Sequence, residues 1–203
     1  MNDKDIEIVG LFPTPVGRSL YKSSLEDELT FALTFKTKQN IHNKISIDND
    51  VLSRQEFQKI REFIDASLFK FTEKALRLKD CEPYVTISWL NFAKPGEFHH
   101  LHRHPNSYIS GVFYLSTFES DDRINFTNPT KFTIEPEYHD FNIFNSNEWY
   151  LNAVPGLLIL FPSTLEHRVV RNDEAKGYRI SLSFNTFLKG KIGRSNSASY
   201  LNL

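Results

Sequence analysis

Four of the seven histidines in this sequence fall within residues 99–104, which is an unusual concentration of metal-binding side chains. Neutral imidazole is a common protein ligand of iron, zinc, copper and nickel. Residues two apart on an extended strand share a face, so His102 and His104 would aim at one point while Arg103 faces away. His100 has the same parity but lies nearer the preceding turn. The His-x-His pair therefore predicts two ligands of one metal ion.

A metal site built on one strand needs a further ligand from elsewhere, and His167 is the best candidate. It follows the apolar run Leu157 to Phe161 and the turn Pro162-Ser163-Thr164. His42 and His139 lie in polar stretches and are poorer candidates. A plainer interpretation stays open for each part, because exposed histidines often cluster without a ligand role and a lone histidine after an apolar strand is often structural.

The elements that must position these histidines are mostly strands in the second half of the chain. After residue 80, short β-type runs alternate with turns that contain Pro, Gly or Asn, which is typical of a sandwich or barrel. The expected strands are residues 85–92, 108–116, 123–126, 157–161, 167–170 and 178–187.

The first half of the chain predicts a long helix over residues 53–78. Ser53 and Glu56 have the spacing of a capping box, and apolar side chains recur at helical intervals as far as Leu78. The remaining expectations there are a short strand that runs into a Pro-containing turn within 6–16, a helix at 24–33 and a loop at 36–50. We therefore expect one domain, 1–203, with a barrel core at about 83–188 and the N-terminal strand and supporting helices within 1–80.

The composition excludes several classes of protein. Hydrophobic residues make up 40% and charged residues 24%, as in an ordinary globular protein. The formal net charge of −1 lacks the excess of Lys and Arg that nucleic-acid binding needs. The single cysteine, Cys81, excludes an intrachain disulfide and suits a reducing compartment. The first residues are acidic, unlike a signal peptide, and no apolar run is long enough to cross a membrane. We expect a cytoplasmic protein.

As an ordered set, the motifs resemble the double-stranded β-helix of the 2-oxoglutarate/Fe(II) oxygenases, in the branch near the prolyl hydroxylases. Those enzymes show a glycine turn, His-x-Asp, a Tyr-Leu strand end, Phe-Pro-Ser, a distal His, and then an Arg or Lys. The counterparts here are Gly96, His102-Arg103-His104, Tyr114-Leu115, Phe161-Pro162-Ser163, His167 and Arg179.

More closely, the chain resembles 2-oxoglutarate oxygenases of bacteria and phages that carry a Leu-Phe-Pro-Thr-Pro-Val segment, here Leu11 to Val16. The resemblance covers nearly the whole chain and is weakest over 17–80 and 118–152. It implies a mainly β fold, a jelly-roll or cupin-like barrel braced by a long helix. The further matches are Trp89 to Asn91, Ser110 to Leu115, Phe161 to His167 and Arg179 to Asn185.

The resemblance implies that His102, His104 and His167 hold Fe(II), with no catalytic residue beyond these ligands. Three protein ligands on one face leave positions for a bidentate 2-oxo acid and O₂. His104 stands where the family has its carboxylate, so three neutral ligands would leave the ion more positive and could shift its preference among iron, zinc and nickel.

The resemblance also implies a site for the cosubstrate, 2-oxoglutarate. Arg179 would form a charge-assisted pair with its remote carboxylate. Ser181, two residues further along the same strand, would add a hydroxyl, and Asn91 is a candidate for a polar contact inside the barrel. The substrate would be a small molecule or a peptide of unknown identity, and the aromatic-rich loops are compatible with a homodimer.

Two alternatives stay open at this point. Gly96 and the His-x-His pair also match the spacing of a cupin, which would make the protein a three-histidine dioxygenase that does not use 2-oxoglutarate. The glutamate that usually follows the cupin His-x-His is missing, because Tyr108 and Ile109 occupy its place. The other alternative is a metal-binding barrel without catalysis. Arg179 separates them, because only bound 2-oxoglutarate requires it.

Overall fold

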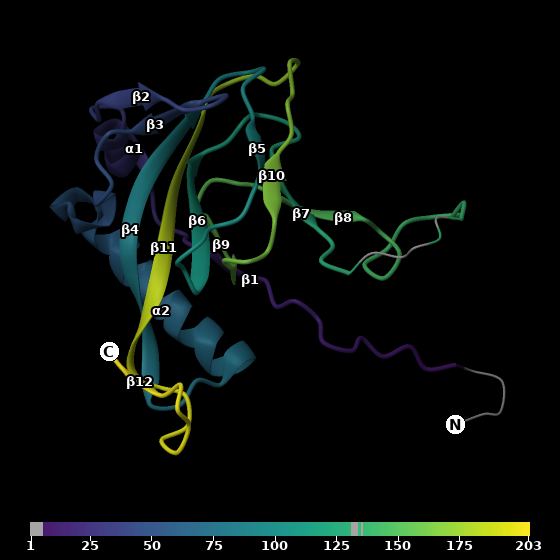
Figure 1. Ribbon diagram of the computed structural model, residues 1–203. Coiled ribbons are helices and arrows are strands. Elements are labelled where there is room, and N and C mark those ends of the chain that lie inside the picture. Colours follow the sequence, from purple (N-terminus) through teal and green to yellow (C-terminus); the bar gives the residue numbers. More distant parts are fainter. Residues whose placement is uncertain (1–5, 131–133, 135) are drawn as a thin grey trace.

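The computed structural model describes residues 6–130, 134 and 136–203, and its strands form two antiparallel sheets (Figure 1). The larger sheet has eight strands in the order β1-β9-β6-β11-β4-β3-β2, with β12 paired to β11, and the smaller has the order β5-β10-β7-β8. The strands are β1 Gly17–Leu20, β2 Thr37–Gln39, β3 Lys44–Ser46, β4 Cys81–Ala93, β5 His99–His102, β6 Ile109–Ser116, β7 Arg123–Thr127, β8 Glu148–Asn152, β9 Leu157–Pro162, β10 His167–Val169, β11 Arg179–Ile192 and β12 Leu201–Asn202.

The two faces of the large sheet are set by the alternation along its central strands. On β11, Ile180, Leu182 and Phe184 enter a core that lies on the helix side of the sheet. The intervening Arg179 and Ser181 line a cavity on the opposite face. Because successive side chains of a strand point to opposite faces, this one strand serves the core and the cavity at once.

The outer face of the large sheet is covered by two helices, α1 (Glu26–Ala32) and α2 (Gln58–Phe71) (Figure 1). Ile60, Ile64 and Leu68 of α2 are buried, and their spacing of four residues forms one apolar stripe. Burial of this stripe against the sheet stabilises the helix more than its intrinsic propensity does.

The predicted helix 53–78 is longer than the α-helix observed. Residues Val51–Ser53 and Gln55–Phe57 form short 3₁₀ turns, and Thr72–Leu76 forms a π turn after α2. The Ser53 hydroxyl donates to the Asp50 carbonyl at 2.8 Å and forms no helix cap. The predicted capping box is therefore wrong, because the serine makes a local turn contact instead.

Two predictions for the N-terminal region are also wrong. Residues 6–16 form no strand and extend away from the sheets (Figure 1). Pro13 and Pro15 lack the amide hydrogen that a ladder needs, and pairing begins only at β1. The segment 36–50, expected to be loop, contains the hairpin β2–β3, whose tip Asn40 N–H donates to the Asn43 carbonyl at 2.8 Å. The hairpin lies at the sheet edge, so it shows little hydrophobic alternation.

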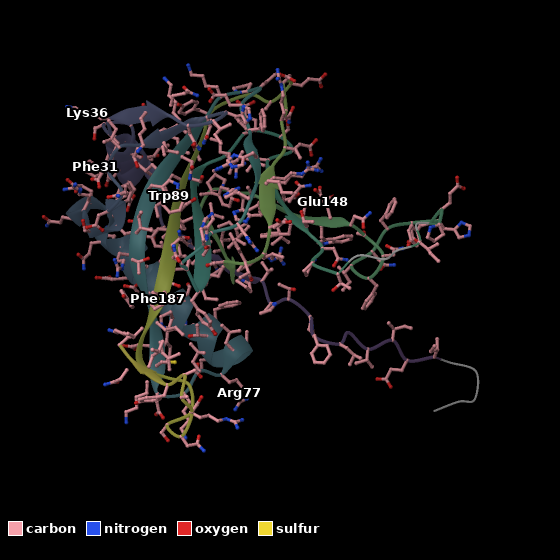
Figure 2. All side chains as sticks on the ribbon, in the orientation of Figure 1. Phe31, Lys36, Arg77, Trp89, Glu148 and Phe187 are labelled. Carbon is pink, nitrogen blue, oxygen red and sulfur yellow. The ribbon has the colours of Figure 1, made fainter. Side chains whose placement is uncertain are left out.

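The small sheet faces the inner side of the large sheet, and side chains fill the space between them (Figure 2). A second apolar core joins the sheets there, with Tyr114 and Phe161 from the large sheet and Ile124 and Phe126 from the small one. Two facing antiparallel sheets with helices outside confirm the predicted jelly-roll architecture. Among the described residues, no helix has the length and apolar character needed to cross a membrane.

Gly111→Ala is expected to destabilise the fold by about 1–3 kcal/mol, because the added methyl would overlap the buried ring of Phe184. Gly111 pairs with Phe184 across β6 and β11, and only a residue without Cβ leaves room for that ring. The midpoint of urea unfolding measures the effect. Gly10→Ala, where a methyl meets only Phe144 at 3.8 Å, is the matched control. Equal midpoints for the two variants would contradict the prediction.

Candidate metal centre

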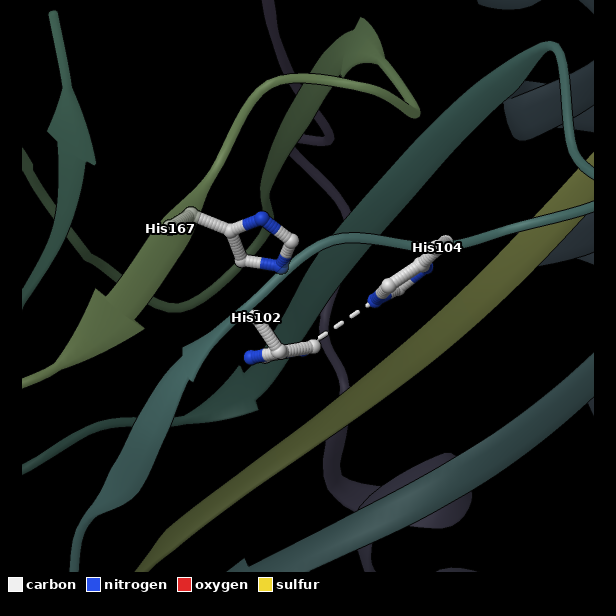
Figure 3. Close-up of side chains that lie close together, drawn as sticks. All are labelled: His102, His104 and His167. Atoms are coloured by element: carbon white, nitrogen blue, oxygen red, sulfur yellow. Dashed lines mark hydrogen bonds between the residues drawn. The ribbon is translucent and has the colours of Figure 1, made fainter.

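Three histidines, two from the neighbouring strands β5 and β10 and one from the loop after β5, meet at the edge of the small sheet (Figure 3). His102 is the last residue of β5, His104 follows it in the connection to β6, and His167 begins β10. The antiparallel register pairs His102 directly with His167. One ring nitrogen from each residue lies within 4.8 Å of the others. The tertiary structure therefore brings together the three side chains singled out in the sequence.

Backbone carbonyls orient two of these rings. His102 Nδ1 lies 2.8 Å from the His100 carbonyl oxygen, and His167 Nδ1 lies 3.0 Å from the Leu165 carbonyl oxygen. A carbonyl oxygen can only accept, so each Nδ1 carries the proton and donates it. The Nε2 atom of both rings is then left with a free lone pair.

The third ring, His104, is oriented by a side chain. Its Nδ1 donates to Asn185 Oδ1 at 2.5 Å, and its Nε2 lies 3.1 Å from His102 Nε2. Two unprotonated nitrogens at this separation repel each other unless a cation lies between them. Two nitrogens that each lie about 2.1 Å from one ion, at about 95° to one another, are about 3.1 Å apart. The residues therefore fit a metal ion.

Burial keeps the three imidazoles neutral. It lowers the pKa of His102 to about 4 and that of His167 to about 3, and the neighbouring histidines oppose protonation as well. The pKa of His104 is also lowered by burial, although its hydrogen bond to Asn185 works in the other direction. Neutral imidazole is the form that binds metal, so the cluster is ready to ligate at neutral pH.

A β-bulge changes which additional histidine faces the centre. His102 pairs with His167 and His99 pairs with Val169, so three steps along β5 match two along β10. The extra residue breaks the simple alternation. The ring of His99, rather than that of His100, therefore stacks on His102 with a centroid distance of 4.3 Å and lines the cavity. The parity that grouped His100 with His102 and His104 is overturned by this bulge.

The two histidines judged poorer candidates do not join the cluster. His42 stacks on Phe98 at a centroid distance of 3.9 Å, and His139 is exposed in the segment before β8.

The cavity between the sheets extends from the histidines to Arg179 on β11. The guanidinium forms a buried ion pair with Asp122, in which Nη1 donates to Oδ1 at 2.9 Å. Only 6% of the Arg179 side chain and 2% of the Asp122 side chain are exposed. The guanidinium carbon also lies 5.1 Å from the centre of the Tyr114 ring. Its Nη2 also donates to the Tyr114 hydroxyl at 3.5 Å, so both amino groups already have a partner within the protein.

Asp122 was missed in the sequence because it is one of two adjacent acids in a polar turn before β7. Burial raises the pKa of its carboxyl group, and the positive charge of Arg179 opposes that rise. The backbone N–H of Phe118 also donates to it, at 3.1 Å. We assign the ionised form, because the guanidinium and this amide both stabilise a carboxylate.

Ser181 and Asn91, the other two predicted cosubstrate contacts, face each other across β11 and β4 and line the same cavity. Asn91 Nδ2 donates to Ser183 Oγ at 2.9 Å, and Asn91 Oδ1 accepts from Trp89 Nε1 at 3.3 Å. The amide of Asn91 is thus held by its neighbours, while Ser181 is 4% exposed beside it.

A family model described as "Putative 2OG-Fe(II) oxygenase" matches residues 87–185, a range that contains the three histidines, Asp122, Arg179 and Asn185. No curated protein sequence matches the chain.

Solved structures of similar fold include a 2OG-Fe(II) oxygenase family oxidoreductase from Burkholderia pseudomallei (TM-score 0.57, 12% identity, 84% of this chain and 84% of that chain). A prolyl-4-hydroxylase from Pseudomonas putida has a TM-score of 0.56 and 14% identity, over 85% of this chain and 92% of that one. HygX from Streptomyces hygroscopicus, solved with nickel, 2-oxoglutarate and hygromycin B, has a TM-score of 0.62 and 12% identity, over 85% and 82%. At these identities the likeness establishes the fold.

Proposed function

We propose that this chain is an Fe(II)- and 2-oxoglutarate-dependent oxygenase whose metal ligands are His102, His104 and His167, and the match of residues 87–185 to a 2OG-Fe(II) oxygenase family model supports this proposal. The observation that carries the proposal is the convergence of three imidazoles, each with its Nδ1 atom in a hydrogen bond to the protein and its Nε2 atom left for an ion. When bound, Fe(II) supplies the oxidising chemistry with O₂ and 2-oxoglutarate, which becomes succinate and CO₂.

The residues of the chain bind and orient the cosubstrate. Arg179 recognises the remote carboxylate with the N–H groups that Asp122 and Tyr114 do not use, and a guanidinium has five N–H donors for such sharing. Ser181 adds a hydroxyl on the same face, and the bonded amide of Asn91 shapes the wall beside it. Apolar side chains of the second core, including Phe161, restrict water around the histidines.

The first experiment adds Fe(II) and then 2-oxoglutarate to metal-free protein without oxygen and records the visible spectrum. We expect a charge-transfer band that needs both additions and is lost in His104→Ala. His139→Ala, which replaces an exposed histidine, is the matched control and should retain the band. Metal binding without any band would contradict the use of 2-oxoglutarate. It would favour the cupin-like dioxygenase, whose metal site is also made of three neutral histidines.

The setting of this activity is also a proposal. We propose a cytoplasmic protein of one domain, with the barrel core at about 83–188, because Cys81 has no partner cysteine in the sequence and suits a reducing compartment. The substrate is a small molecule or a peptide. Exposed apolar side chains such as Ile8 and Phe12 in the N-terminal segment, and Phe144 before β8, support a homodimer.

A further inference from the structure

The side of His104 that faces away from the metal centre contacts Asn185 on β11. The two residues are 81 positions apart in the chain, and their hydrogen bond at 2.5 Å joins the loop after β5 to the centre of the large sheet. Asn185 pairs with Ser110 of β6, and a bulge in the pairing of β11 with β4 follows it directly. The backbone at Asn185 therefore lies between two paired strands, β6 and β4.

We propose that Asn185 is a positioning residue for the metal centre. Its amide oxygen accepts the Nδ1–H of His104, which selects the tautomer with a free Nε2 lone pair and turns that atom toward His102. This inference rests on the proposed function, because it takes His104 as a ligand, and it adds a residue that contacts neither the ion nor the cosubstrate.

His104 depends on this contact more than the other two ligands depend on theirs. His102 and His167 lie in strands and donate to carbonyls only two residues earlier in the chain. Local backbone geometry therefore orients both rings. His104 lies beyond the end of β5, where its backbone N–H donates to the Ser163 carbonyl at 2.9 Å. Its ring is oriented by side chains of the large sheet.

Buried serines fix which end of the Asn185 amide faces the histidine. Ser110 Oγ donates to Asn185 Oδ1 at 2.8 Å and lies 2.8 Å from Ser163 Oγ. Both serines are at most 1% exposed, so water cannot replace these bonds freely. A reversed amide would place its NH₂ group against the Nδ1–H of His104. Ser110 Oγ also lies 2.9 Å from His104 Nδ1, so this serine contacts both partners of the hydrogen bond. The serine contacts therefore hold the amide oxygen where His104 needs an acceptor.

The chemistry of this partner also affects how strongly His104 binds the ion. A hydrogen-bond acceptor at Nδ1 raises the basicity of Nε2, and a carboxylate does so more than an amide. In this chain a neutral ligand is backed by a neutral amide. Asn185→Asp would place a carboxylate against His104, without contact to the ion. It would add one negative charge to a site whose three ligands are all neutral.

The test measures metal affinity in the full chain by calorimetry with Ni²⁺, and with Co²⁺ as a spectral probe. We expect Asn185→Ala to weaken binding by about 10–100-fold. Asn185→Asp, which keeps the acceptor, should bind at least as tightly as the wild type. Asn152→Ala replaces an exposed asparagine on β8 and should bind like the wild type. A purely structural role would not separate the alanine and aspartate variants in this way.

The tautomer provides a second measurement that needs no substitution. Long-range ¹H–¹⁵N spectra of the metal-free wild type should show the His104 proton on Nδ1, and a proton fixed on Nε2 would overturn the proposal. If the wild type binds metal and a folded Asn185→Ala variant binds it with equal affinity, the positioning role of Asn185 is overturned. The proposed function would then still stand. A wild type that binds no metal would overturn both.

Discussion

His102→Ala and His167→Ala are each expected to yield a folded protein that no longer retains a metal ion. Each substitution removes one of three converging imidazoles, and two imidazoles do not define a face of the coordination sphere. Loss of a partner that only orients a ligand costs about 10–100-fold in affinity, so loss of the ligand should cost more than roughly 100-fold. Metal analysis after dialysis measures the retained ion, and circular dichroism reports the fold.

The fold should survive because the surroundings of His167 are mainly aromatic and apolar. Its ring packs against Phe161 and Phe126, with centroid distances of 4.6 and 6.2 Å. These side chains belong to the core between the sheets and do not need the imidazole as a partner. His139→Ala serves as the control for the number of histidines, since His139 is exposed. Full metal occupancy in both ligand variants would rule out the assigned centre.

Asp122→Asn is expected to destabilise the metal-free protein by about 3–5 kcal/mol, because it leaves the buried charge of Arg179 without a counter-ion. The same substitution should make the protein respond more strongly to 2-oxoglutarate. A bound carboxylate would supply the charge that the variant lacks, whereas in the wild type Asp122 already supplies it. We therefore expect a larger rise in melting temperature on addition of 2-oxoglutarate for the variant than for the wild type.

Urea unfolding measures the loss of stability. Thermal melts with and without 2-oxoglutarate measure the rise in melting temperature that the cosubstrate causes. Asp173→Asn is the matched control, because it breaks the exposed pair of Arg171 with Asp173, whose side chains are 62% and 64% exposed. Exposed pairs contribute little to stability, so neither quantity should change in that variant. If the response of Asp122→Asn to 2-oxoglutarate equals that of the wild type, Arg179 does not bind the cosubstrate carboxylate.

Most strands of the sheets and part of the metal centre could be predicted from the sequence. Six strands of the second half lie where the alternation and turns predicted them, because the side chains of a strand alternate between its two faces. On β11 the same alternation places Arg179 and Ser181 on the cavity face. The candidate ligands were recognisable because two share a short motif and the third follows a buried strand and a turn.

The hydrogen-bond partners of those residues could not be predicted, because they come from strands far apart in the chain. Asp122 meets Arg179 across 57 positions and Asn185 meets His104 across 81, and neither pairing leaves a local periodic signal. The bulge in β5 that turns His99 into the cavity arises from pairing with β10. Periodicity records the face on which a side chain lies. Register, bulges and contacts between strands distant in the chain depend on how the sheets pack, and these set the orientation and charge of the centre.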